Sequence, residues 1–86
     1  MNYRVFIKPS AYKELYKLEK LVIRRINEVV IKLSENPRPY GNEKLKTWDL
    51  YRIRIGNYRI IYSINDKQHL VEINAVKDRK EIYRKL

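Results

Sequence analysis

The most regular pattern of apolar positions runs along residues 21–35 and predicts an amphipathic helix. Five apolar residues recur at positions i, i+4, i+7, i+8 and i+11, which places them on one face of an α-helix. They are Val22, Ile26, Val29, Val30 and Leu33. The NPRP run at residues 36–39 ends this helix, because proline has no N–H group for the next turn.

A strand and a shorter helix are predicted before this segment. Residues 3–8 alternate and are rich in β-prone side chains, which is typical of a strand. Residues 11–19 place Ala11, Leu15 and Leu18 at helical spacing, and Ser10 stands where an N-cap is expected. The two helices are expected to form a helical hairpin.

Residues 50–64, LYRIRIGNYRIIYSI, predict a tight β-hairpin. Two runs rich in Tyr and Ile flank Gly56-Asn57, a dipeptide that favours a two-residue primed turn. In this register Arg54 lies opposite Arg59, and opposed residues share a face of the sheet. One face is then apolar and aromatic: Tyr51, Ile53, Ile55, Tyr58, Ile60, Tyr62 and Ile64. The other face carries three arginines: Arg52, Arg54 and Arg59.

The arginine face suggests a ligand. Like charges directly opposite each other destabilise a sheet, so a chain selected only for folding would rarely place Arg54 against Arg59. Clustered guanidinium groups are suited to bidentate contacts with anions. An anionic partner is therefore predicted, and phosphate is the first candidate.

Residues 40–47 are expected to be a polar connector, and a further strand is predicted at residues 69–76 after a turn at 65–68. In that register His69, Val71, Ile73 and Ala75 join the apolar face. Glu72 and Asn74 join the arginine face, with Asn74 beside Arg59. A short helical turn in the tail would bring Arg79 and Tyr83 to one side. The predicted fold class is α+β: one domain spanning residues 1–86, with an antiparallel sheet packed against an N-terminal helical hairpin in the order β-α-α-β-β-β.

The amino-acid composition indicates which kinds of binding partner and which cellular compartment to expect. Twenty Lys and Arg against ten Asp and Glu give the 86 residues a formal charge of +10. Such an excess favours nucleic acid or an acidic protein, although a merely solvated basic surface is the alternative. The chain has no cysteine, which favours an intracellular, cytoplasmic protein. No run is long enough to span a membrane. The first ten residues have no signal-peptide core, and they include the strand expected at residues 3–8.

The types of residue present also limit which catalytic or binding reactions the chain can support. There is one histidine, and the two glycines form no phosphate-binding loop. No cluster has metal-ligand spacing, so neither metal nor cofactor is expected. What remains is a basic and aromatic set: Arg52, Arg54, Arg59, Lys77, Arg79 and Tyr83. Such a set can bind a phosphodiester and stabilise a pentavalent transition state, with the RNA 2′-hydroxyl as nucleophile. It can equally bind RNA or an acidic peptide without cleavage.

Two sequence blocks resemble a known family. The first block is residues 44–62, where KLK is followed after three residues by LYRIRIGNYRIIY. The second is the tail DRKEIYR at residues 78–84. In these blocks the chain resembles the RelE/ParE superfamily of toxins from prokaryotic type II toxin–antitoxin pairs, with the RelE branch favoured. The resemblance implies a ribosome-dependent mRNA endoribonuclease (an mRNA interferase) that cuts in the ribosomal A site, leaves a 2′,3′-cyclic phosphate and inhibits translation. It also implies an acidic, RelB-like antitoxin that binds the toxin in a hetero-oligomer.

The resemblance assigns roles residue by residue. Arg52 and Arg54 match two basic strand residues that are lysines in well-studied members. Arg59 matches the arginine that contacts the scissile phosphate, and Tyr83 matches the tyrosine that stacks on a base or moves a proton. Arg79 matches the basic residue before that tyrosine. Five further basic residues are expected to contact RNA: Lys44, Lys46, Lys77, Lys80 and Arg84.

The chain departs from the family pattern at the proton-accepting group. Arginine stays protonated at neutral pH, so Arg52 and Arg54 stabilise charge but are poor bases. Many relatives have His where this chain has Asp78. That carboxylate can serve as a base or cap the last turn, and the spacing to Glu81 favours the cap. Tyr83 is the remaining candidate for the base. Two other functions stay open: inhibition of DNA gyrase, as in the ParE branch, and a non-catalytic basic binding module.

Overall fold

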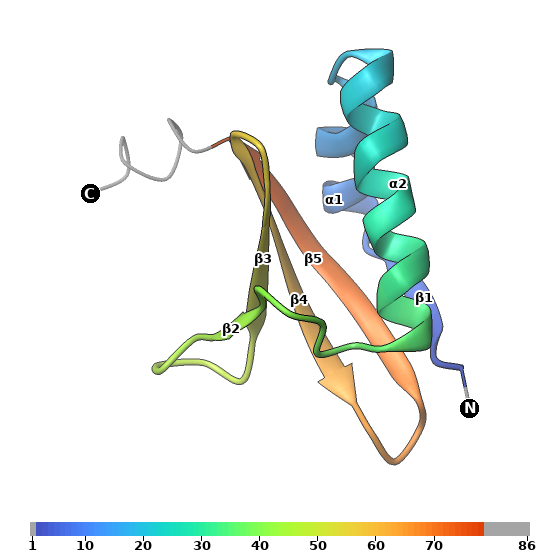
Figure 1. Ribbon diagram of the computed structural model, residues 1–86, viewed down its shortest axis with the longest axis vertical. Coiled ribbons are helices and arrows are strands. Elements are labelled where there is room, and N and C mark those ends of the chain that lie inside the picture. Colours follow the sequence, from blue (N-terminus) through green and yellow to red (C-terminus); the bar gives the residue numbers. More distant parts are fainter. Residues whose placement is uncertain (1, 79–86) are drawn as a thin grey trace.

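The computed structural model describes residues 2–78, and its elements follow the predicted order with one short strand added before the hairpin. They are β1 (Arg4–Ile7), α1 (Pro9–Tyr16), α2 (Lys20–Glu35), β2 (Glu43–Lys44), β3 (Tyr51–Ile55), β4 (Tyr58–Asn65) and β5 (Leu70–Asp78). Both helices lie on the same side of the sheet (Figure 1). The α+β fold class is confirmed. The predicted helical turn in the tail lies outside the described residues.

The sheet is mixed, which corrects the antiparallel arrangement expected from the sequence. Its strand order is β1-β5-β4-β3-β2. β1 runs parallel to β5, and the other neighbouring pairs are antiparallel. The helical pair carries the chain from β1 across to the rest of the sheet, and such a crossover permits parallel pairing. β1 has only four residues, and nothing in their sequence indicates whether the strand pairs in a parallel or an antiparallel direction.

β2 is an element that the sequence did not predict. It has two residues, and it pairs Glu43 with Arg52 and Lys44 with Tyr51 of β3. Its residues are polar and exposed, so they show no apolar alternation. The strand is defined only by its backbone pairing to β3. The side chains of residues 40–47 do not indicate a strand, so their sequence predicted a connector.

The predicted register of the β3–β4 hairpin is confirmed at every pair. Ile55 lies opposite Tyr58, Arg54 opposite Arg59, and Ile53 opposite Ile60. Gly56 has φ of +58°, a left-handed conformation that glycine adopts without the steric cost of a side chain. The Gly-Asn dipeptide therefore fixes the turn, and the turn fixes which residues face one another.

The predicted register of β5 is wrong. The strand starts at Leu70, opposite Asn65, and the ladder shifts between Ile61 and Tyr62, which leaves Asn74 out of the paired residues. A β-bulge adds one residue on one strand and changes which face the following side chains take. The bulge brings Val76 into the core in place of Ala75. The bulge and the different pairing at the turn together place Lys77, rather than Asn74, opposite Arg59.

His69 does not lie on the core face of β5 either. It belongs to the turn before the strand and has φ of +50°. Its ring lies 5.1 Å from the ring of Tyr3, measured between centroids. The histidine is thus part of the packing between the N-terminal segment and the β4–β5 turn.

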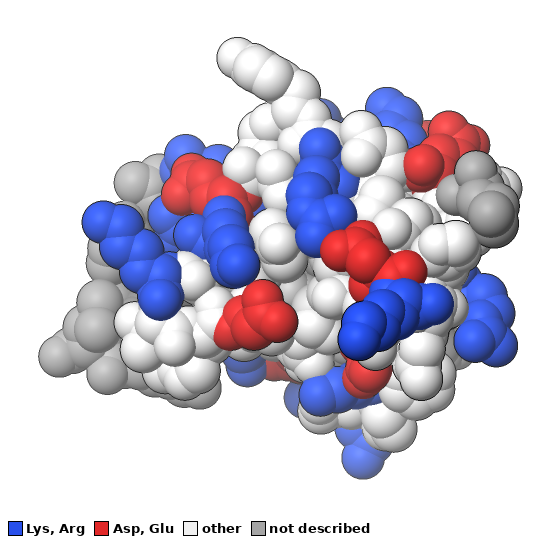
Figure 2. Space-filling view, turned by 90° about the horizontal axis from the view of Figure 1, so that it is seen from below, with Lys and Arg blue, Asp and Glu red and all other residues white. Residues whose placement is uncertain are grey.

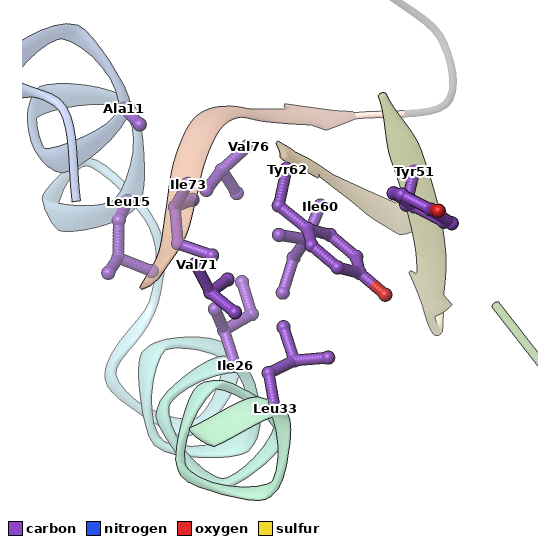
Figure 3. Packing of buried hydrophobic residues seen from close by; sticks show 10 residues of the cluster. All are labelled: Ala11, Leu15, Ile26, Leu33, Tyr51, Ile60, Tyr62, Val71, Ile73 and Val76. Carbon is purple, nitrogen blue, oxygen red and sulfur yellow. The ribbon is translucent and has the colours of Figure 1, made fainter. Parts of the chain in front are cut away.

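The core fills the space between the helices and one face of the sheet. Figure 3 shows Leu15 of α1 beside the β5 side chains, and Ile26 and Leu33 of α2 below the sheet. The fully buried side chains include Ile60 and Tyr62 of β4. This confirms the predicted helical stripes and the predicted apolar face of the hairpin.

The start of α1 differs from the prediction. The helix begins at Pro9 with Lys8 in the N-cap position, so the N-cap predicted at Ser10 is wrong. Proline is favoured in the first turn of a helix because its missing N–H needs no partner there.

A polar network ties the β4–β5 turn to two distant segments. Arg38 donates to both carboxylate oxygens of Asp66, at 3.2 and 2.9 Å, and the Tyr3 hydroxyl donates to Asp66 at 2.6 Å. These hydrogen bonds, that from Arg38 first, lower the pKa of Asp66 from 3.8 to about 2. The carboxylate thus links the N-terminal segment, the loop after α2 and the turn.

Acid should remove this contribution to stability. A carboxyl group whose pKa is lower in the folded protein stabilises it above the unfolded pKa, here 3.8, and the effect is lost as pH falls through about 2. Thermal melts of wild type and Asp66→Asn should differ most above about pH 5 and converge as pH falls from about 4 towards about 2. Asp49→Asn is the control, since Asp49 forms an exposed pair with Lys44 at 3.7 Å. A difference between wild type and the Asp66→Asn variant that stays constant with pH would contradict the prediction.

Candidate anion-binding site

Two neighbouring strands place the predicted arginines together on the side of the sheet away from the core. Arg52 and Arg54 come from β3 and Arg59 from β4, all in the confirmed register. Arg59 lies opposite Lys77 across the β4–β5 pairing, but Lys77 directs its Nζ to Glu14 of α1. Across the hairpin, Arg59 faces Arg54. The arrangement costs stability, because like charges face each other. It concentrates guanidinium groups where an anion can bind several at once.

The three arginines line a small pocket, together with two residues from the segment before β3. The pocket has a volume of about 120 Å³ and is lined by Gly41, Glu43, Arg52, Arg54 and Arg59. This space is large enough for a phosphate group, whose oxygens guanidinium groups bind well. We refer to it as the arginine pocket. It is the geometric counterpart of the predicted phosphate site.

Glu43 is a member of the arginine pocket that the sequence reasoning missed. It lies directly opposite Arg52, and Arg52 donates from Nη2 to Oε2 of Glu43 at 2.7 Å. This hydrogen bond lowers the pKa of Glu43, with further contributions from the charges of Arg59 and Arg54. The one available signal was an acidic residue directly before the KLK run. Nothing in that signal shows that the residue pairs with β3.

The chemistry available in the arginine pocket follows from these groups. The guanidinium groups can bind phosphate oxygens and stabilise the added negative charge of a phosphoryl transition state. They cannot accept a proton. Glu43 is ionised at neutral pH and can accept one, but its lowered pKa makes it a weak base.

The predicted RNA-binding lysines are not all brought to this pocket. Lys44 lies opposite Tyr51, so it shares the face of Tyr51 rather than that of the arginines. Its Nζ is 5.9 Å from the centroid of the Tyr51 ring. Lys46 is exposed in the loop after β2. Lys77 lies opposite Arg59, and its Nζ donates to Glu14 of α1.

The remaining predicted site residues, Arg79, Lys80, Tyr83 and Arg84, lie outside the described residues. Asp78, the carboxylate considered as a cap or base, ends β5 opposite Tyr58. It lines a different hollow, about 300 Å³, together with Lys17 and Lys77. The structure therefore places Glu43 in the arginine pocket and Asp78 beside another hollow.

Acidic side chains interrupt the basic surface elsewhere too. Figure 2 shows basic side chains lying directly beside acidic ones across the face seen from below. On that face the basic side chains therefore lie in small groups rather than over one continuous surface. Ion pairs between basic and acidic side chains include those of Arg38 with Asp66 and of Lys44 with Asp49.

Residues 2–78 contain no cluster suited to a metal ion, since no three or more of their His, Asp and Glu side chains are grouped so as to hold one. Within the same part of the chain, neither helix is long and apolar enough to cross a membrane.

Comparison with known proteins identifies the class. The profile of the family described as "ParE toxin of type II toxin-antitoxin system, parDE" matches residues 5–83. The toxin RelE of Mycobacterium tuberculosis is 33% identical over 84 residues, which cover 95% of this chain and 87% of that protein. Both matches extend through the hairpin that carries the arginines.

Solved structures agree with these sequence matches. A chain of the archaeal RelE-RelB complex from Pyrococcus horikoshii has a TM-score of 0.83 and 39% identity, covering 92% of this chain and 97% of that one. A chain of the toxin-antitoxin complex RelBE2 from M. tuberculosis has a TM-score of 0.81 and 27% identity, covering 92% and 100%.

The fold and the matches define a small toxin of the type II toxin–antitoxin class. Within that class, the chain belongs to the RelE/ParE superfamily, and its relatives place it in the RelE branch. The family resemblance drawn from residues 44–62 and 78–84 is thereby confirmed.

Proposed function

We propose that this toxin is a metal-independent endoribonuclease that cuts mRNA in the ribosomal A site. The observation that carries the proposal is the arginine pocket, in which Arg52, Arg54 and Arg59 converge on a space of about 120 Å³. RNA supplies its own nucleophile, the 2′-hydroxyl, so the protein must mainly orient the phosphodiester and stabilise charge. Three guanidinium groups meet the second requirement.

In this proposal the arginine pocket binds the phosphate, and Arg59, by its match to the family motif, contacts the scissile phosphate. Arg79 and Tyr83, by their match to the family motif, would complete the site from the tail, and Tyr83 is the proposed proton acceptor. The ribosome would supply the remaining alignment of the mRNA, because the described residues carry no strong base at the pocket. The proposed RNA contacts outside it are Lys44, Lys46, Lys77, Lys80 and Arg84.

We also propose that an acidic, RelB-like antitoxin binds and blocks this toxin in the cytoplasm, where ribosomes and mRNA are found. The support comes from relatives that were solved in complexes with their antitoxins, including the RelE-RelB complex of P. horikoshii. The formal charge of +10 favours an acidic partner.

Induced expression tests the function directly. The chain should stop translation within minutes, and primer extension should map cleavages inside codons on ribosome-bound mRNA, with little cleavage of the same RNA when naked. Purified ribosomes programmed with a short mRNA should give a 2′,3′-cyclic phosphate end. Normal growth of the expressing cells, with intact transcripts, would contradict the proposal.

A second function is favoured by one observation, the match to the ParE toxin profile. The ParE branch inhibits DNA gyrase. Gyrase inhibition predicts induction of the DNA-damage response while mRNA stays intact, so the same expression experiment separates the two functions.

A further inference from the structure

The arginine pocket contains an anion of its own, the Glu43 carboxylate. Glu43 lies opposite Arg52, accepts a 2.7 Å hydrogen bond from it, and lines the pocket with the three arginines. A pocket that is suited to phosphate is thus partly occupied by a side-chain carboxylate.

A phosphate group would compete with Glu43 on two counts. It needs guanidinium N–H groups that Arg52 now directs to the carboxylate. It also brings negative charge close to a second negative charge, with little screening at contact distance. Both effects oppose anion binding as long as Glu43 stays ionised and paired.

The pairing is weak enough to be displaced. The Glu43 side chain is 63% exposed, and the Arg52 side chain is 37% exposed. Ion pairs this exposed contribute little to stability. Glu43 also lies on a strand of two residues at the edge of the sheet, so the carboxylate can move away without disturbing the core.

We propose that Glu43 is a positioning residue that lowers the affinity of the arginine pocket for phosphate by holding Arg52 until a phosphate group displaces it. The inference rests on the proposed function, since it concerns the same phosphate site. As a result, the pocket binds isolated phosphate groups weakly. An mRNA that is also held by many ribosomal contacts can still displace the carboxylate and bind.

The test is a titration of the purified 86-residue chain with inorganic phosphate, followed by NMR of the arginine Nε–Hε signals. Glu43→Gln keeps the size of the side chain and removes its charge. It should bind phosphate about tenfold more tightly than wild type, which corresponds to about 1.4 kcal/mol. Asp49→Asn is the matched control, because it removes the same charge from the neighbouring loop, where Asp49 pairs with Lys44. Its affinity should stay within about twofold of wild type.

A second measurement separates positioning from a general change in charge. In an Arg52→Ala background the gain from Glu43→Gln should fall to about twofold or less, since the two effects are coupled through one ion pair. A gain that persists unchanged in that background would overturn the role assigned to Arg52 and, with it, the inference.

Two further outcomes are also decisive. If Glu43→Gln binds phosphate as wild type does, or more weakly, while Arg59→Ala still weakens binding, the inference about Glu43 fails and the proposed phosphate site stands. If Arg59→Ala leaves phosphate binding unchanged, the proposed site itself fails and the inference fails with it.

Discussion

Replacing Arg59 by alanine is expected to lower the rate of ribosome-dependent mRNA cleavage by about 10²- to 10³-fold, the usual effect of removing one charge-stabilising donor from a transition state. Arg59 lines the arginine pocket and lies between Arg54 and Lys77 in the sheet. By its match to the family motif, its guanidinium group is the proposed contact to the scissile phosphate. Single-turnover cleavage on programmed ribosomes measures the effect.

The same substitution should leave stability unchanged or slightly higher. Arg59 lies opposite Arg54 in the hairpin, and removing one of two facing like charges relieves their repulsion. Lys77, on the other side, is paired with Glu14. A large loss of cleavage without a fall in melting temperature is thus the expected signature. Arg59→Lys, which keeps the charge but not the bidentate geometry, should lie between wild type and alanine.

Arg24→Ala is the matched control, because Arg24 is exposed on α2, away from the arginine pocket. It removes one positive charge and should change cleavage by less than about twofold, within the small effect of a screened surface charge. Cleavage by Arg59→Ala at the rate of the Arg24→Ala control would contradict the placement of the phosphate at the arginine pocket.

The sequence predicted the arginine cluster well because local chemistry determines it. Gly56-Asn57 fixes a two-residue turn, and a two-residue turn fixes the register of both strands. Arg54 then has to face Arg59, and alternation puts the isoleucines Ile53 and Ile60 on the other side. The apolar stripe that ends at Leu33 was predicted for the same reason, since helical spacing is a local property.

The parts that were missed depend on pairing between separate segments. The β5 register differs first at the turn, where Asn65 pairs with Leu70, and again at a bulge that leaves Asn74 out of the ladder. No local residue preference marks the position of the bulge. Glu43 enters the arginine pocket through a two-residue strand whose partner, β3, begins only after an intervening loop. A periodic pattern needs more than two residues, so this carboxylate could be placed only by the folded structure. The parallel pairing of β1 with β5 depends in the same way on the whole topology.

Replacing Ile60 by alanine is expected to cost about 2–5 kcal/mol of folding free energy, the usual range for removing a fully buried isoleucine side chain. Ile60 has no exposed surface and lies in β4, between Ile53 of β3 and Val76 of β5. Figure 3 shows it within the cluster of buried side chains above Leu33. Small domains have total stabilities of about 5–15 kcal/mol, so this one substitution could remove much of the total.

The consequence for function is opposite to that of Arg59→Ala, although the two residues are adjacent in β4. Ile60→Ala should lower the melting temperature by about 4–8 °C for each kcal/mol lost, yet its folded fraction should cleave near the wild-type rate at low temperature, because the arginines keep their register. Ile60→Val, which removes one methylene, should cost only about 0.5–1.5 kcal/mol. Urea denaturation of the three proteins measures the stabilities, and cleavage assays at about 10 °C and about 37 °C measure activity. If Ile60→Ala were as stable as wild type, the core assignment of β4 would be wrong, and the face assigned to the arginines would be wrong with it, since alternation along β4 ties the two together.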